Sequence, residues 1–170
     1  MMVARSTIKV KDVKEALTAL LRGKYGTAYR IYGKPDEEGF ETPAFFVDVR
    51  LVDLHAETIN IFKKEFSVHI VYFQEDPSGA GAEADQYQKI DDIANLLVSR
   101  DARNPKGGLK LKVKDRFIDA TEFSSDYTGR ANNILSISFS LSLMDFKEVR
   151  SEEEDELMGE FIFNETVEEE

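Results

Sequence analysis

Few residues in this chain could carry out catalysis, and their spacing does not fit the known kinds of catalytic or metal-binding site. Neither of the two histidines, His55 and His69, lies at zinc-ligand spacing from another histidine. Residues 79–81 (Gly-Ala-Gly) lack the glycine pattern of a phosphate-binding or dinucleotide-binding loop. Asp91 and Asp92 are neighbours in a predicted helix, where side chains point roughly 100° apart. They therefore cannot share one metal ion, and we expect them to face solvent.

Other signatures of enzymes and cofactor sites are also missing from the sequence. There is no cysteine, which excludes disulfides, thiolate nucleophiles and cysteine-ligated zinc. No G-x-S-x-G nucleophile motif occurs. The acidic run at 152–156 lacks the glycine and the alternating ligands of an EF-hand calcium loop. The sequence therefore predicts no catalytic residue, no cofactor and no metal, and it indicates an assembly component and not an enzyme.

The negative charge of the chain is concentrated near its C-terminal end. The formal net charge is −11, and residues 148–170 hold eleven acids against one base, so the preceding residues are nearly neutral. A basic surface for nucleic acid is absent from this composition. No apolar run is long enough to span a membrane, and residues 1–12 lack the apolar stretch of a secretory signal. We expect a protein that is assembled in the cytosol and has no membrane partner.

Two long alternating runs between residues 43 and 73 are the elements around which the chain is organised. The apolar positions of the first run are Phe45, Val47, Val49 and Leu51, and those of the second are Phe62, Phe66, Val68, Ile70 and Tyr72. A period of two residues places each set on one face of a half-buried strand. The polar stretch at 55–58 can turn the chain between them. The pattern predicts a long antiparallel hairpin.

The first run changes its parity after Leu51, because Val52 and Leu54 are apolar while Asp53 is polar. One extra residue in a strand reverses the facing of everything that follows, so we expect a β-bulge at Leu51–Val52. Each arm covers about 12 residues, which at about 3.3 Å per residue extends for roughly 40 Å. An arm of this length exceeds what the core requires, and we expect its distal part to contact something outside its own subunit.

The remaining pattern predicts two helices and four further strands. The helices span about residues 9–22 and 83–98, and the strands span 28–32, 109–113, 118–123 and 134–146, with a turn at 126–133. The predicted apolar face of the second helix consists of Tyr87, Ile90, Ala94 and Leu97, with Ile93 alongside. In the last strand apolar residues alternate with four serines. This order favours an α+β fold with an antiparallel or mixed sheet and both helices on one face.

We expect residues 1–147 to form a single α+β domain and residues 148–170 to form an acidic C-terminal extension. Acidic tails are most often solvated, but this one is interrupted by Leu157, Met158, Phe161, Ile162 and Phe163. Short apolar segments on such an arm are suited to strand addition or groove binding on a neighbouring subunit. Local packing onto the same subunit is the alternative.

Several stretches taken together resemble one known family. They are the amphipathic first helix, Ile31-Tyr32-Gly33, residues 38–47 (EGFETPAFFV) and residues 66–73 (FSVHIVYF). In these stretches, and in the order of elements over residues 7–146, the chain is similar to the phage tail terminator (tail completion) proteins of Gram-positive phages and phage-like particles. The resemblance implies a non-enzymatic α+β subunit at the head-proximal end of the virion tail. It also implies a ring, usually a hexamer, that caps the completed tail tube, ends its polymerisation and provides the interface to the head-side connector or collar.

The partners implied by this resemblance are further copies of the chain, the tail tube protein, and sheath and head-side connector proteins. DNA would only pass through the lumen without specific binding. A ring subunit must bury surface against two neighbours, and we expect residues 52–64 to pack on the adjacent subunit. The expected interface residues are Val52, Leu54, His55, Thr58, Ile59, Ile61, Phe62, Lys63, Leu157, Phe161, Ile162 and Phe163. Acidic residues expected at the lumen or rim, where they would repel passing DNA, are Asp36, Glu37, Glu38, Glu152, Glu153, Glu154 and Glu156.

Two other functions remain open at the level of the sequence. A head–tail joining protein or a tail tube subunit of the same particle could have a similar small α+β fold, although a tube subunit would polymerise into open stacks. A non-viral module that binds a partner through its acidic arm would be a monomer or dimer in solution.

Overall fold

The computed structural model describes residues 7–33, 39–97, 108–129 and 133–146. Its elements follow the predicted order of helix, three strands, helix and three strands. They are α1 (Val10–Tyr25), β1 (Arg30–Tyr32), β2 (Ala44–Ala56), β3 (Ile61–Phe73), α2 (Ala82–Leu97), β4 (Lys110–Val113), β5 (Arg116–Thr128) and β6 (Ile134–Phe146). The C-terminal extension predicted for 148–170 lies outside the described residues, so the proposed division into domain and extension stays a prediction.

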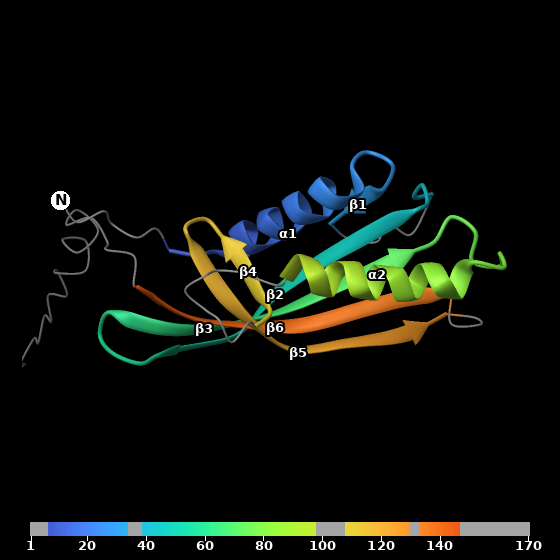
Figure 1. Ribbon diagram of the computed structural model, residues 1–170. Coiled ribbons are helices and arrows are strands. Elements are labelled where there is room, and N and C mark those ends of the chain that lie inside the picture. Colours follow the sequence, from blue (N-terminus) through green and yellow to red (C-terminus); the bar gives the residue numbers. More distant parts are fainter. Residues whose placement is uncertain (1–6, 34–38, 98–107, 130–132, 147–170) are drawn as a thin grey trace, which may run out of the picture.

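The six strands form one mixed sheet in the order β1-β2-β3-β6-β5-β4. β1 pairs with β2 in parallel, and the other neighbours pair antiparallel. The sheet is curled, and both helices lie over the same side of it (Figure 1). The predicted α+β class, the mixed sheet and the placement of the helices are confirmed.

A single core lies between the helices and the facing side of the sheet. α1 contributes Val13, Leu17 and Leu21, and α2 contributes Ile93 and Leu97. The sheet contributes the predicted parities: Phe45, Val47 and Val49 from β2, Phe66, Val68, Ile70 and Tyr72 from β3, and Leu135, Ile137, Phe139 and Leu141 from β6. The other side of the sheet, with the serines of β6, has no helix over it among the described elements (Figure 1).

The β2–β3 hairpin is as long as the sequence predicts, with 13 residues in each strand. Leu51 pairs with Phe66 and Asp53 pairs with Glu65, so the register shifts by one residue at the predicted bulge. The turn was misplaced by two residues, because β2 continues through His55 to Ala56 before the chain reverses. Backbone hydrogen bonds from Glu57 and Thr58 to the carbonyl of Ile61 close this turn.

β5 differs from the prediction of a short strand at 118–123 followed by a turn at 126–133. The strand runs to Thr128, through the polar stretch at 124–126, because residues Ser124 to Thr128 pair along β6. A second register shift between Thr121 and Ser124 bends it. Pairing to a neighbouring strand, which the sequence pattern does not encode locally, decides the length of β5.

The buried face of α2 agrees with the prediction at Ile93 and Leu97 but differs from it at Tyr87. Tyr87 is exposed, and the buried positions are Gln86, Lys89, Ile93 and Leu97. Lys89 belongs to the buried face, and its ammonium lies 2.8 Å from the Asp85 carboxylate and 5.1 Å from the centre of the Tyr29 ring. A charged side chain in the core is rare unless paired, so a pattern of apolar residues alone could not identify this face.

Candidate assembly surface

The distal end of the sheet forms a projection that we call the arm. It comprises residues 51–65 of the β2–β3 hairpin together with residues 143–146 of β6, and its tip extends past both helices (Figure 1). Six of the eight large apolar side chains that are exposed among the described residues lie on it: Leu51, Val52, Leu54, Ile59, Met144 and Phe146. Scattered exposed apolar residues are normal, but a cluster of this kind marks a surface for binding another molecule.

The bulge gives the arm an apolar strip on the side of the sheet that carries the helices. Leu51 pairs with Phe66 and Leu54 pairs with Lys64. Phe66 and Lys64 are two residues apart and share one face of β3, so Leu51 and Leu54 share that face as well. In a regular strand without a bulge, Leu54 is three positions after Leu51 and would point to the opposite side. The bulge therefore extends the apolar surface of the core into the exposed arm.

The opposite face of the arm carries a second pair of exposed apolar residues. Met144 pairs with Lys63, and Phe146 pairs with Ile61. Met144 and Phe146 lie on the same face of β6 as its four serines and follow Ser142. This face therefore changes from small polar to large apolar side chains where the arm begins. Sequence analysis did not select Met144 or Phe146, although their place at the end of an alternating strand was available as a signal.

The predicted interface residues are divided between the exposed arm and a part of the chain that is not described. Val52, Leu54, His55, Thr58 and Ile59 are all exposed, with Ile59 at 88% of its full accessible surface. Ile61, Phe62 and Lys63 are half-buried between β2 and β6. Leu157, Phe161, Ile162 and Phe163, and all seven predicted lumen or rim residues (Asp36, Glu37, Glu38, Glu152, Glu153, Glu154 and Glu156), lie outside the described residues.

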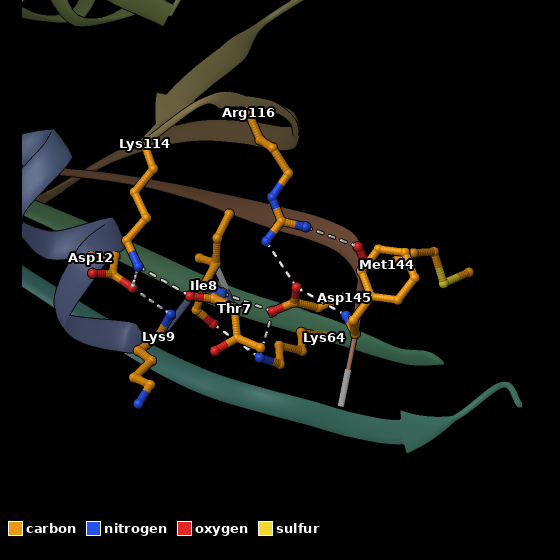
Figure 2. A network of polar contacts seen from close by, with 10 residues as sticks. Thr7, Ile8, Lys9, Asp12, Lys64, Lys114, Arg116, Met144 and Asp145 are labelled. Atoms are coloured by element: carbon orange, nitrogen blue, oxygen red, sulfur yellow. Dashed lines mark hydrogen bonds and ion pairs between the residues drawn. The ribbon is translucent and has the colours of Figure 1, made fainter. Parts of the chain in front are cut away.

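A buried carboxylate anchors the root of the arm (Figure 2). Asp145 lies on the core-facing side of β6, and its side chain has no exposed surface. It contacts the Lys64 ammonium at 2.7 Å and the Arg116 guanidinium at 2.8 Å. The backbone N–H groups of Ile8 and Phe146 donate to it at 2.8 Å and 3.0 Å. Burial would raise the pKa of this carboxyl, but Lys64, Arg116 and the Ile8 N–H hold it below its usual value.

The same network fixes the segment that precedes α1. Lys64 also donates to the carbonyl of Ile8 at 3.0 Å, and Lys114 donates to the carbonyl of Thr7 at 3.1 Å. Lys114 further pairs with Asp12 in the first turn of α1 at 2.8 Å. Figure 2 shows these contacts converging from the start of α1, β3, the β4–β5 turn and the end of β6. Ile8, whose backbone takes part in this network, is fully buried.

This network was missed in the sequence, yet two residues carried a signal for it. Lys64 lies between Phe62 and Phe66 at core-facing parity, and Asp145 follows Leu143 at core-facing parity in β6. Two opposite charges at buried positions of strands that pair together are expected to contact each other. The contributions of Ile8 and Arg116 could not be predicted, because they depend on tertiary packing.

The edge of the arm near the tip carries a small charged group. The His55 Nδ1 lies 2.9 Å from the Asp53 carboxylate, and its Nε2 lies 3.0 Å from the Glu57 carboxylate. These hydrogen bonds raise the pKa of the exposed imidazole above its usual value. Among the described residues no group of three or more His, Asp or Glu side chains is arranged to hold a metal ion. His55 is therefore part of a surface charge cluster.

Asp92 departs from the expectation that both Asp91 and Asp92 face solvent. Asp91 is exposed, but Asp92 accepts a hydrogen bond from the Tyr25 hydroxyl at 3.0 Å and pairs with Lys24 at 3.4 Å. Burial is the main cause that raises the pKa of Tyr25, and the charge and hydrogen bond of Asp92 raise it further. The Tyr25 hydroxyl therefore stays protonated and donates to Asp92. Asp92 therefore fastens α2 to the end of α1. No described helix is both long and apolar enough to cross a membrane.

The structure is therefore a well-packed α+β domain from which an exposed apolar arm, anchored by a buried charge network, projects. A family model for phage tail terminator proteins matches residues 12–156, and the chain belongs to this family. The proteins of this family are structural, non-enzymatic components of the phage tail.

Solved structures with similar folds share little sequence with the chain. The sheath/tube terminator of an extracellular contractile injection system (PVC), in its extended state, is 15% identical with a TM-score of 0.48, over 85% of this chain and 58% of that chain. Our chain thus spans little more than half the length of that protein. A second solved protein is 12% identical with a TM-score of 0.42, over 81% of this chain and 97% of its own. No curated protein sequence matches the chain.

Proposed function

We propose that this chain assembles into a closed ring of six copies that sits on the head-proximal end of the tail tube. There it ends tube polymerisation and presents a surface to the head-side connector. The tube protein contacts one side of the ring, and sheath and connector proteins are further partners. The observation that carries the proposal is the apolar arm. Its exposed apolar side chains provide a surface through which one copy of the chain can bind the next.

In this proposal the distal hairpin, residues 52–64, packs on the adjacent subunit. Val52 and Leu54 are 58% and 50% exposed, and Ile59 is exposed to a greater degree still. Burial of such side chains stabilises an interface by about 25 cal/mol per Å² of apolar surface removed from water. A ring subunit offers one surface to each of two neighbours, and the arm supplies the first of these surfaces.

Shortening the arm tests this function. Residues 55–63 are replaced by an Asn-Gly turn, which closes the hairpin at the Leu54–Lys64 pair and keeps Lys64 in contact with Asp145. We expect a folded protein with the far-ultraviolet circular dichroism of the parent, but a monomeric mass by light scattering. Retention of the parental oligomer by the shortened protein would contradict the role of the arm.

A matched control substitutes one residue in a different hairpin. The β5–β6 connection lies at the opposite end of the sheet from the arm (Figure 1). Replacing its Gly129 by Ala strains a backbone that has φ of 83° but leaves the arm unchanged. This variant is expected to lose stability and to keep its oligomeric state, which separates effects on association from effects on folding.

A further inference from the structure

We propose that the tip of the arm of one copy inserts into a groove beside β1 of the next copy, so that the ring is joined head to tail. This inference rests on the proposed function, because it names the second of the two surfaces that a ring subunit needs. The groove lies between the end of α1, β1 and the segment at 39–41, and encloses about 830 Å³. Its lining includes Arg22, Thr27, Tyr29, Arg30, Ile31 and Tyr32.

The groove and the tip lie at opposite ends of the sheet. β1 pairs with Ala44–Phe46, the first three residues of β2, whereas the tip follows Ala56, the last residue of β2. A strand of this length separates them by roughly 40 Å at about 3.3 Å per residue. Figure 1 shows the tip at the left end of the molecule and β1 well away from it, beyond the middle of the sheet. Two different surfaces placed in this way form a heterologous contact, which generates a ring when the rotation closes.

The chemistry of the groove matches that of the tip. Tyr29, Ile31 and Tyr32 are half-buried and give the groove an apolar and aromatic part, which suits the exposed Ile59 side chain. β1 is an edge strand of the sheet, and β2 is the one described strand that pairs with it. An exposed strand edge presents backbone N–H and C=O groups that another chain can pair with. An extended hairpin is the kind of segment that fits such an edge.

The charges of the described residues are also complementary. The end of the arm next to the tip carries Asp53 and Glu57, both of which contact His55. The groove carries Arg22 and Arg30, of which Arg30 pairs with Glu41 at 2.8 Å, so its lining is positive by one charge. Opposite charges at the rim of an interface orient the partners and speed their encounter. These charges favour a contact in which the groove of one copy binds the tip of another. They disfavour a symmetric contact in which the grooves of two copies face each other.

Crosslinking between engineered cysteines tests this contact directly, because the natural chain contains no cysteine. Ile59 and Thr27 are both exposed, and the variant I59C/T27C is treated with a short bis-maleimide at a concentration where the parent forms rings. R22C replaces T27C in a second pair. The matched control is I59C/K112C, since Lys112 is exposed on β4 at the other edge of the sheet. Each variant is first required to match the parent in circular dichroism and in oligomeric mass.

A head-to-tail contact predicts a ladder of crosslinked species up to the full ring for both groove pairs. Cysteines held at an effective millimolar concentration should react roughly a thousandfold faster than those of the control pair at micromolar protein. Rings without this ladder would overturn the groove assignment and leave the proposed function standing. Crosslinked dimers formed by the single variant I59C would indicate a symmetric contact between two tips, and they would overturn the groove assignment in the same way. A parent protein that is monomeric at all concentrations would overturn the proposed function and this inference with it.

Discussion

Replacing Asp145 by Asn should destabilise the protein by about 3–5 kcal/mol. The carboxylate is fully buried and holds Lys64 and Arg116, whose side chains are each only 16% exposed. Removing one member of a buried ion pair costs this much because the remaining charge is left without compensation. The amide also presents an N–H to two cationic donors where the carboxylate presents only acceptors. For a domain that is stable by about 5–15 kcal/mol, this is a large fraction.

The assay is urea unfolding at fixed protein concentration, because association also stabilises the folded state. The matched control is Asp119→Asn, which removes an exposed carboxylate (69% exposed) that lies 3.3 Å from Lys110 and should cost less than about 1 kcal/mol. A loss at Asp145 no larger than that at Asp119 would refute our reading of the network.

The pH dependence of the same pair of proteins provides an independent check. The folded-state pKa of Asp145 is lowered, so its contribution is present above the unfolded value of about 3.9 and is lost as the pH falls through the folded pKa. The difference in stability between the parent and Asp145→Asn should therefore shrink on acidification below pH of about 4. A difference that is constant over this range would contradict the assignment of the charge to Asp145.

Three further predictions concern the arm and the helices. Leu54→Asp should abolish the oligomer in light scattering with little change in unfolding free energy, since Leu54 is half-exposed in the isolated subunit; an unchanged mass would argue against the arm as a contact. Lys89→Met should lower the unfolding free energy by about 2–4 kcal/mol, because among the described residues it leaves the Asp85 carboxylate without a cation and with the neutral donors Tyr72 and Gln74 beside it, and Asp85→Asn in the same chain should add little. His55 should titrate above its usual pKa by NMR, and Asp53→Asn should lower that pKa. Because the folded pKa is raised, any stability from this cluster is present at low pH and is lost as the pH rises through the folded pKa.

Local patterns predicted the parts of the fold in which apolar residues alternate regularly. The parity change at Leu51–Val52 located the bulge, and the alternation from Leu135 to Leu143 predicted both the bounds and the buried face of β6. The order of elements and the placement of both helices on one face followed from the same patterns, because burial of one face per element dictates how the layers pack.

The features that could not be predicted are those in which charged residues occupy the interior. Lys89 is part of the buried face of α2. It is paired with Asp85 and surrounded by tyrosine rings that come from α1, the following loop and β3. Asp145 is stabilised by Ile8 and Arg116, which are distant in sequence. Such sites depend on several elements meeting in space, whereas periodicity reports only on one element at a time.

The exposed arm is a different case, since the length of its hairpin, its bulge and its start near Leu51–Val52 were predicted but the contribution of β6 was not. The sequence shows where the hairpin becomes longer than its core, and the structure shows that the change occurs at the Asp145 network. Met144 and Phe146 join the arm because β6 extends as far as β3 does.

The mass of the purified protein, measured by native mass spectrometry together with negative-stain electron microscopy, tests the central claim most directly. We predict one closed ring of six copies that does not grow as the concentration rises. Monomers or dimers at all concentrations, or open tubes that lengthen with concentration, would contradict the account.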